Sequence, residues 1–485
     1  MKTCGEGNNP CFASSFACKA FRTKLYYYNE DSKCGVMLPI THAWKEGSMI
    51  DLIETTPQMD LVTQDIEHLV EELCTYHTIY SPLFQRREQR EAAHTYLQGL
   101  LATLPRKSIE PMVLAVDGVA PKAVRAMQSF ISEGQWNDER LLHQHWKEVE
   151  TDLGADDGVL MVDGSDFPKQ GGHSVGVKRQ YCGELGKRAN CQAGVFVGYG
   201  SSQGYTLLDR RLYVPAEWLT DDAYAERRRQ CGMPPETTFK TKPELAQEMI
   251  TAVVKSQALR CRWVVADEAF GNNPGFLDGV AELGLWYFAE VPHSTRVWEE
   301  RPATHLPPWR GRGRRPQRER LVAGAPEAQT VLEVAAALPA EAWTRQTIKE
   351  GSQGPMVAEF AAMRVVAVRD TLPGPDVWLV LRRHVETGEL KTYLCNAPVD
   401  TALETCVRMS GMRWPIETCF EDSKQLLGMG DDEVRSWTGW HHHMTLVILA
   451  HFFVVRMSLR LKKSPGSDIA PGRDGVGDGL APPRV

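Results

Sequence analysis

Two short apolar runs, each followed directly by an aspartate, place the strongest limit on how this chain folds. Residues 159–162 read Val-Leu-Met-Val and lead to Asp163, and residues 263–266 read Trp-Val-Val-Ala and lead to Asp267. Such runs are typical of strands buried on both faces of a parallel sheet. We therefore predict that each strand ends at its aspartate and delivers that carboxylate to one edge of the sheet. Either aspartate alone is also compatible with a structural role as a helix cap.

A third carboxylate lies on a predicted helix far along the chain. Glu417 follows Arg413 by four positions and precedes Lys424 by seven. This spacing places all three side chains on roughly the same helical face, where they could hold a metal ion and a phosphate together. The alternative is a solvent-exposed amphipathic helix with ion pairs between neighbouring turns.

The order of elements predicts an α/β fold. After residue 158 we expect a strand at 159–162, a hairpin over 193–214, a helix from Thr241, a strand at 263–266, a helix near 274–283 and a strand at 285–291. Parallel strands linked by helices bring their carboxyl ends together. Asp163 and Asp267 are therefore predicted neighbours.

The flanking segments have different patterns. Apolar residues at helical spacing predict a helical domain over 59–150, with a possible DNA-binding role, and apolar runs near 363–369, 377–383 and 390–396 predict a β-rich insertion over 293–405. We expect 1–58 to be an irregular extension without an assigned role, 151–292 and 406–462 to form the central domain, and 463–485 to be a disordered tail.

Composition excludes several classes of protein. The 485 residues are 42% hydrophobic with a net charge of −7, which argues against binding of nucleic acid through overall positive charge. The twelve cysteines include no C-x2-C pair, so we expect reduced thiols in a cytoplasmic chain rather than a zinc site. The longest apolar run, 446–455, is too short to span a bilayer, and we predict a buried helix there. We see no secretory signal, and no membrane partner is expected.

Local basic segments remain candidates for phosphate contacts. Six arginines stand against one glutamate between residues 310 and 320, and the candidates are Arg310, Arg312, Arg314 and Arg315. A merely solvated loop is the alternative. The same two interpretations apply to Arg86, Arg87, Arg90, Arg106 and Lys107. Three adjacent histidines, 441–443, point in different directions on a helix and cannot all bind one ion, so packing or a DNA contact is the better interpretation.

Three carboxylates without suitably spaced cysteine or histidine ligands suit hard cations, chiefly Mg²⁺ or Mn²⁺. Two such ions activate a water or 3′-hydroxyl and stabilise the leaving oxygen at a phosphodiester. In this hypothesis Asp163 bridges both ions, and Asp267 and Glu417 each hold one. Arg413 and Lys424 would bind the phosphate.

From about residue 84 to 453 the chain resembles the insertion-sequence DDE transposases, in the cut-and-paste group whose third motif is Tyr-x2-Arg-x3-Glu-x6-Lys. The resemblance rests on Val162-Asp163-Gly-Ser-Asp-Phe-Pro-Lys169, Ser174-Val-Gly-Val-Lys-Arg-Gln-Tyr-Cys-Gly183, Ala266-Asp267-Glu-Ala-Phe-Gly271 and Arg413-Trp-Pro-Ile-Glu417 through Lys424. It implies an RNase H-like catalytic core with a β-rich insertion. It also implies Mg²⁺-dependent cleavage and joining at the terminal inverted repeats of a mobile element, by a homodimer on double-stranded DNA.

This chain departs from the motif at one position. The tyrosine would fall at residue 410, which is Ser410 here, so a phosphate contact made by that tyrosine is missing or comes from elsewhere. Members of the wider group stack an aromatic ring on a flipped base, and Trp298 is the candidate for that role, although a core tryptophan is the ordinary interpretation. Asp166 is a rival metal ligand, but it lies past the predicted strand end, and we prefer Asp163.

Two alternatives to a transposase remain open. One is a nuclease of the same fold that cuts DNA without joining it, and the other is a domesticated DNA-binding protein without catalysis. The presence of all three acidic residues argues against the second.

Overall fold

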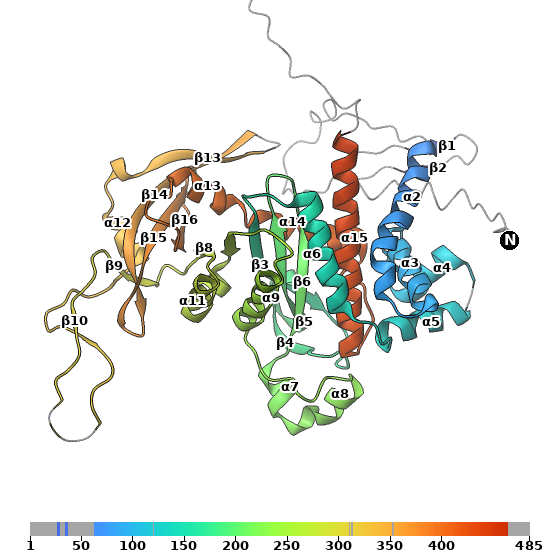
Figure 1. Cartoon of the computed structure of the whole chain (residues 1–485), viewed down its shortest axis with the longest axis horizontal. Helices are drawn as coiled ribbons and strands as arrows, with labels where there is room; N and C mark the ends of the chain where they lie inside the picture. Colours follow the sequence, from blue (N-terminus) through green and yellow to red (C-terminus); the bar gives the residue numbers. More distant parts are fainter. Residues whose placement is uncertain are drawn as a thin grey trace, which may run out of the picture.

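The computed structural model describes residues 27–29, 34–36 and 63–463, apart from residues 120, 310, 312, 313, 352 and 353 (Figure 1). Of the expected N-terminal extension, only a small hairpin of β1 (Tyr27–Asn29) and β2 (Cys34–Val36) belongs to the described residues. The tail predicted over 463–485 lies outside them from residue 464.

One mixed sheet of twelve strands runs through the described part of the chain. Its central strands follow the order β6-β5-β3-β7-β8, with β3, β7 and β8 parallel to one another and β5 antiparallel to both β3 and β6. The strands here are β3 (Val159–Pro168), β4 (Lys178–Cys182), β5 (Lys187–Gly200), β6 (Tyr205–Tyr213), β7 (Trp263–Ala266) and β8 (Trp286–Glu290). The α/β class predicted from the sequence is confirmed.

Helices connect these strands as the sequence indicates. The connections are α7 (Ala216–Thr220), α8 (Ala225–Gln230), α9 (Lys242–Ser256), α10 (Glu268–Gly271) and α11 (Pro274–Glu282). The helix predicted from Thr241 is α9, and it begins with a capping box in which the backbone N–H of Thr241 donates to the Glu244 carboxylate over 2.7 Å.

The insertion continues the central sheet rather than forming a separate layer. β16 pairs antiparallel with β8, with Tyr393 opposite Glu290, and β15, β14 and β9 follow outward. The elements are β9 (Arg296–Trp298), β10 (Thr304–His305), β11 (Arg320–Leu321), β12 (Gln329–Thr330), α12 (Val331–Ala337), β13 (Thr344–Gly351), β14 (Gly354–Arg369), β15 (Leu372–His384) and β16 (Leu390–Cys395). The three predicted strands are present within β14, β15 and β16, whereas β13 was not predicted.

In Figure 1 most of the N-terminal helices lie at the opposite end of the molecule from the insertion. They are α2 (Thr63–Tyr80), α3 (Arg87–Leu101), α4 (Ile109–Asp117), α5 (Pro121–Ser132) and α6 (Asp138–Leu153). Tyr76 donates its hydroxyl to the carbonyl of Leu449 over 2.8 Å, which ties α2 to the long C-terminal helix α15 (Trp437–Lys463). The hydrophobic core runs without interruption from these helices into the sheet. The helical pattern is confirmed, while a separate domain over 59–150 stays a prediction.

The long helix α15 is a core element. Within the described residues, one helix is long and apolar enough to cross a membrane, Trp437–Arg460, but 72% of that apolar window is buried inside the protein. His441, His442 and His443 are buried, and their ring nitrogens contact backbone carbonyls of Trp437, Ile131 and Met429. Burial lowers the pKa of His442 to about 4. These contacts favour packing over metal binding for the three histidines.

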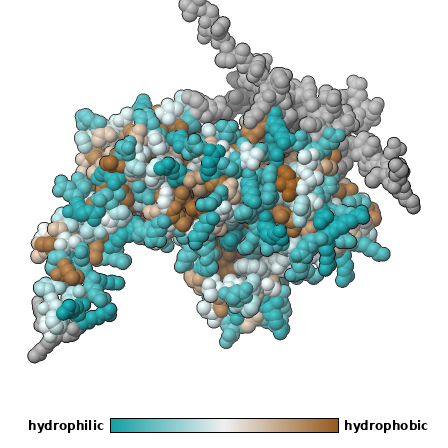
Figure 2. Space-filling model, in the orientation of Figure 1, coloured by the Kyte–Doolittle hydropathy of each residue, from teal (hydrophilic) through white to brown (hydrophobic). Residues whose placement is uncertain are grey.

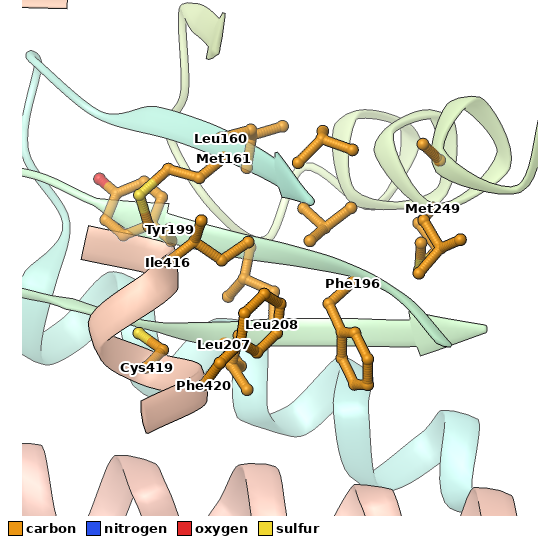
Figure 3. Close-up of a cluster of buried hydrophobic side chains, with 14 of the residues drawn as sticks. Leu160, Met161, Phe196, Tyr199, Leu207, Leu208, Met249, Ile416, Cys419 and Phe420 are labelled. Carbon is orange, nitrogen blue, oxygen red and sulfur yellow. The ribbon is translucent and has the colours of Figure 1, made fainter. Parts of the chain in front are cut away.

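Helix α14 (Trp414–Leu427), preceded by α13 (Leu403–Gly411), presses its apolar face onto the sheet. Ile416, Cys419 and Phe420 are buried and point toward Met161 and Phe196 of the sheet (Figure 3). Burial of each large apolar side chain contributes about 1.5–3 kcal/mol, so this face fixes how the helix is rotated. Glu417 therefore lies at the rim of the contact.

The surface drawn in Figure 2 is mainly hydrophilic, with hydrophobic residues in scattered patches.

Candidate active site

Asp163 lies where β3 no longer pairs with β7 but still pairs with β5. The prediction that β3 ends at Asp163 is wrong, because β3 continues to Pro168 through antiparallel pairing with β5. On its other side β3 pairs with β7 only as far as Val162 opposite Ala266. The shorter parallel partner, not the end of β3, leaves the Asp163 side chain open to the site.

The last pair between β3 and β7 joins Val162 to Ala266, and the next residues along the two strands are Asp163 and Asp267. The two aspartates therefore lie at the same level of the sheet. Neighbouring strands are about 4.8 Å apart, which makes the two aspartates neighbours as predicted. Asp267 is also the N-cap of α10, since its Oδ1 accepts the backbone N–H of Ala269 over 3.0 Å. The structural and functional interpretations of this residue are therefore compatible.

Glu417 comes to the same place from α14, and Arg413 joins it to Asp163. One terminal nitrogen of Arg413 donates to Oδ2 of Asp163 over 3.2 Å, and the other contacts the carboxylate of Glu417. Two carboxylates separated by about half of the chain thus share one guanidinium group. The side chains of Asp163, Glu417 and Arg413 are 15%, 38% and 29% exposed, so the cluster is partly shielded but still reachable from solvent.

The cluster carries more negative than positive charge. Burial, together with the charge of Asp267, raises the pKa of Asp163 to about 7, although Arg413 and the backbone N–H of Gly164 act in the opposite direction. Burial also raises the pKa of Asp267. One guanidinium against three carboxylates leaves a net charge of −2 when all three are ionised, which is a deficit that a divalent cation would remove.

The donor set fits a hard divalent cation, because it consists of carboxylate oxygens from three separate elements. Among the described residues, no three acidic, histidine or cysteine side chains already converge closely enough to hold an ion. In this conformation Arg413 stands between Asp163 and Glu417. Asp163, Asp267 and Glu417 are the residues that would hold such an ion.

Asp166 lines a hollow together with Asp163 and Glu417, but its side chain lies on the other face of β3. Side chains alternate between the two faces of a strand, so Asp166 points away from the face that carries Asp163. Its Oδ2 accepts the backbone N–H of Gly183 over 2.6 Å. Asp166 lies within β3, not past its end as predicted, and the alternation of the strand supports Asp163 as the ligand.

Lys424 does not contact Glu417. Its ammonium group pairs with Glu184, in the connection between β4 and β5, and also donates to the backbone carbonyl of Asp166 over 3.3 Å. Glu184 was not singled out in the sequence, because nothing in its local pattern links residue 184 to residue 424. The Lys424 side chain is 22% exposed, so a phosphate can reach it.

Two hollows meet at Glu417. One, of ≈ 390 Å³, is lined by Asp163, Glu417, Glu184 and Lys424 among others. The second, of ≈ 230 Å³, lies on the insertion side and also includes Glu417 and Arg413. Three cations from the insertion face this second hollow, namely Lys349, Arg382 and Lys391. Two larger hollows along α6, of ≈ 710 and ≈ 530 Å³, contain none of the three carboxylates, and we therefore place the chemistry at Glu417.

Comparison with known proteins agrees with this geometry. A family model described as DDE superfamily endonuclease matches residues 80–355, which is more than half of the chain. The chain belongs to this family. The match includes Asp163 and Asp267 and ends before Glu417, so the family model does not bear on the third carboxylate.

A curated relative is similar to the chain over part of its length. The chain is 28% identical over 239 residues to a protein from Microchaete diplosiphon described as a probable transposase for insertion sequence element IS701. The aligned region is 49% of this chain and 57% of the relative, so the chain spans little more than half of that relative's length.

Only some of the other predicted DNA contacts belong to the described residues. Arg310 and Arg312 lie outside the described residues. Arg314 is exposed and contacts Gln317, and Arg315 lies over the exposed ring of Trp309 with its guanidinium carbon 5.3 Å from the ring centroid. Their roles stay predictions. Lys107, by contrast, is buried and contacts the carbonyls of Leu100 and Leu426, so it holds α3 against α14.

Trp298 is enclosed in the insertion. It is 4% exposed, and its indole N–H donates to the carbonyl of Pro326 over 2.9 Å. Its ring is a packing element in this conformation, and a stacking role stays a prediction that requires the insertion to open. Ser410 is buried as well, and its hydroxyl donates to the carbonyl of Val407 over 2.7 Å.

Glu290 is a site residue that the sequence reasoning missed. It ends β8, the third parallel strand, and pairs with Lys391 over 3.1 Å at the edge of the second hollow. The signal was present, because Glu290 ends an apolar run as Asp163 and Asp267 do. Its charge also raises the pKa of Asp267, after the larger effect of burial.

Proposed function

We propose that this chain is a DNA transposase that cleaves the ends of a mobile element and joins them to target DNA. The observation that carries the proposal is the convergence of Asp163, Asp267 and Glu417 on Arg413 from three distant segments. The description of the partly aligned relative as a probable transposase supports transposition as the biological context. The family description supports cleavage of a phosphodiester.

An RNase H-like core is part of this proposal. Three parallel strands flanked by an antiparallel pair, in the order β6-β5-β3-β7-β8, support it, as does the acidic helix α14 after the insertion. In this core Asp163 and Asp267 lie where the parallel pairing of β3 and β7 ends, at the edge where ligand sites of α/β sheets occur, and Glu417 joins them from α14.

DDE superfamily endonucleases generally use divalent metal ions. We infer Mg²⁺ or Mn²⁺ for this chain, in two sites held by Asp163, Asp267 and Glu417. Bound there, two such ions would supply the activation of water or a 3′-hydroxyl and the stabilisation of the leaving oxygen. The residues of the chain contribute the rest. Asp163 must be ionised to act as a ligand, and Arg413 and Lys424 bind and orient the phosphate on either side of Glu417.

The proposed substrate is double-stranded DNA with terminal inverted repeats, bound by a homodimer in the cytoplasm. The cations at the second hollow support a DNA path across the insertion, because Lys349, Arg382 and Lys391 come from three insertion strands, β13, β15 and β16, and line this hollow together with Glu417. Arg314 and Arg315 on the exposed β10–β11 segment would add phosphate contacts at its outer end.

The test is an assay with Mg²⁺ on DNA that carries the sequences bracketing the gene. We expect nicked or cut ends followed by strand-transfer products in a target plasmid. Asp163→Asn should reduce cleavage by more than about 100-fold, since loss of even an outer partner of a metal ligand costs 10–100-fold. Asp222→Asn, an exposed aspartate on the same chain, is the matched control and should leave cleavage unchanged.

A nuclease that cuts without joining is the second candidate, because the family description names an endonuclease and not a transposase. Cut ends without any joined product would favour it. Cleavage that survives in Asp163→Asn would contradict both functions.

A further inference from the structure

Arg413 occupies the position that a metal ion needs. Its two terminal nitrogens contact Asp163 and Glu417, which are two of the three proposed ligands. The lone pairs that accept these hydrogen bonds are among those that would coordinate a cation. In this conformation, the guanidinium is the counter-charge of the carboxylate cluster.

We propose that Arg413 is a displaceable lock on the metal site, and that a DNA phosphate releases it, so that DNA and divalent cations bind cooperatively. The inference rests on the proposed function, because it takes the three carboxylates as metal ligands. It concerns how the ions gain access to these ligands, not what reaction follows.

Arg413 can move without disturbing the fold. It is the residue before α14, with φ −76° and ψ −34°, and its side chain makes no capping hydrogen bond to the helix. Among the hydrogen bonds and ion pairs of the described residues, a rotation of the side chain breaks the two to these carboxylates. The guanidinium is 29% exposed and also lines the hollow on the insertion side.

That hollow offers the attraction that would draw Arg413 away. Lys349, Arg382 and Lys391 face it, with Glu290 paired to Lys391. A phosphate bound by these cations would attract Arg413, and the bidentate fork of a guanidinium suits a phosphate at least as well as two separate carboxylates. Arg413 would then leave Asp163 and Glu417 free for metal.

Cooperativity follows from this exchange. Without DNA, a divalent ion must displace a cation that already contacts its ligands. With DNA, the displacement has already occurred, so the ion binds more tightly, and by reciprocity the ion tightens DNA binding by the same factor. The consequence is a centre that acquires its metals mainly when a phosphodiester is present.

The experiment measures the affinity of Mn²⁺ by electron paramagnetic resonance of the free ion. Wild type, Arg413→Gln and Arg408→Gln are each titrated with and without a duplex of random sequence, and binding to the duplex alone is subtracted. Arg408→Gln removes the same charge from α13, where Arg408 pairs with Asp157 over 3.3 Å and not with the three carboxylates.

For wild type and Arg408→Gln we expect DNA to tighten Mn²⁺ binding by about 10-fold, within the range usual for coupled sites. Arg413→Gln should bind Mn²⁺ about 10-fold more tightly than wild type without DNA, and DNA should change that affinity by less than about 2-fold. Equal Mn²⁺ affinity of Arg413→Gln and Arg408→Gln without DNA would overturn the proposal.

Two further variants keep the test decisive. Arg413→Lys retains the charge but has one ammonium in place of the fork, and it should give intermediate coupling; it replaces Arg413→Gln if circular dichroism shows that the latter does not fold. Adding Asp163→Asn to Arg413→Gln should abolish the tight Mn²⁺ binding. If tight binding persists, the metal lies elsewhere, and the proposed function fails rather than the lock alone.

Discussion

Two clusters of carboxylates and arginines within the described residues differ in charge balance. In the first cluster, Asp163, Asp267 and Glu417 face the single guanidinium of Arg413. In the second, Asp209 and Asp138 face Arg210 and Arg211. The second cluster is neutral, whereas the first has a net charge of −2 when ionised.

The two clusters also differ in burial and in their contacts. Arg210 and Asp209 are 1% and 2% exposed, and Asp209 accepts hydrogen bonds from both arginines, over 3.2 Å from Arg210 and 2.8 Å from Arg211. This network joins β6 to the start of α6 through Asp138. A charge cluster that is buried and balanced serves the fold, and one that is accessible and short of positive charge is suited to bind a cation.

The largest expected effect is the loss of a partner in the balanced cluster. Asp209→Asn should destabilise the protein by about 3–5 kcal/mol, because it leaves Arg210 and Arg211 with the single carboxylate of Asp138 and so one uncompensated charge in a buried cluster. Urea unfolding, with and without Mn²⁺, measures the change. A loss below about 1 kcal/mol would show that the Asp209 network is not a structural element.

The same substitution in the other cluster should have the opposite sign. Asp163→Asn should stabilise the metal-free protein at pH 8 by up to roughly 4 kcal/mol, since the pKa of Asp163 is raised to about 7 in the fold from its ordinary value of 3.8. The amide also removes repulsion from Asp267. A loss of stability at pH 8 would contradict the charge deficit that we assign to this cluster.

The pH dependence of stability tests the raised pKa of Asp163 in the wild-type protein. Between pH 4 and pH 7 the folded state retains a proton on Asp163 that the unfolded state has released. The contribution of Asp163 to stability is thus full below its unfolded pKa and is lost as pH rises through its folded pKa. The stability difference between Asp163→Asn and wild type should therefore grow from pH 4 to pH 7 and then level off. A difference independent of pH would contradict the shift.

Metal binding should also distinguish the two clusters, by a smaller difference in the free energy of unfolding. At Mn²⁺ concentrations about 100-fold above the dissociation constant, the free energy of unfolding of wild type should rise by about 2.7 kcal/mol. Asp209→Asn should gain a similar increment on its lower baseline, and Asp163→Asn should gain almost none. Thermal unfolding at pH 8 provides the measurement. Equal gains in Asp163→Asn and wild type would place the ion outside the first cluster.

The smallest effect concerns the ion pair at the rim of the site. Glu184→Gln should change the free energy of unfolding by less than about 1 kcal/mol, because its pair with Lys424 is partly exposed. It should nevertheless tighten DNA binding a few-fold at low salt, since Lys424 becomes available to phosphate. Glu217→Gln, which breaks the exposed pair with Lys178, is the matched control. Equal DNA affinity of the two variants would show that Lys424 does not contact DNA.

The sequence was sufficient to predict the parts of the site that depend on local pattern. The apolar runs before Asp163 and Asp267 predict buried strands, and their proximity follows from the geometry of parallel strands. The helix predicted around Glu417 is present as α14.

Contacts between distant segments could not be predicted in this way. The continuation of β3 past Asp163 depends on pairing with β5, and the extension of the sheet into the insertion depends on the pairing of β8 with β16. The same holds for Glu184 beside Lys424 and for Arg413 between two carboxylates, because side-chain partners are set by packing and not by spacing along the chain.

The central claim is that Asp163, Asp267 and Glu417 hold divalent cations together. The most direct measurement replaces Mg²⁺ with Fe²⁺ in the DNA-bound protein, generates hydroxyl radicals at the bound ion with ascorbate, and maps the cuts in the protein backbone by mass spectrometry. We predict cuts next to residues 163, 267 and 417 that excess Mg²⁺ suppresses. Cuts confined to other segments, or cuts near only one of the three residues, would contradict a shared metal centre.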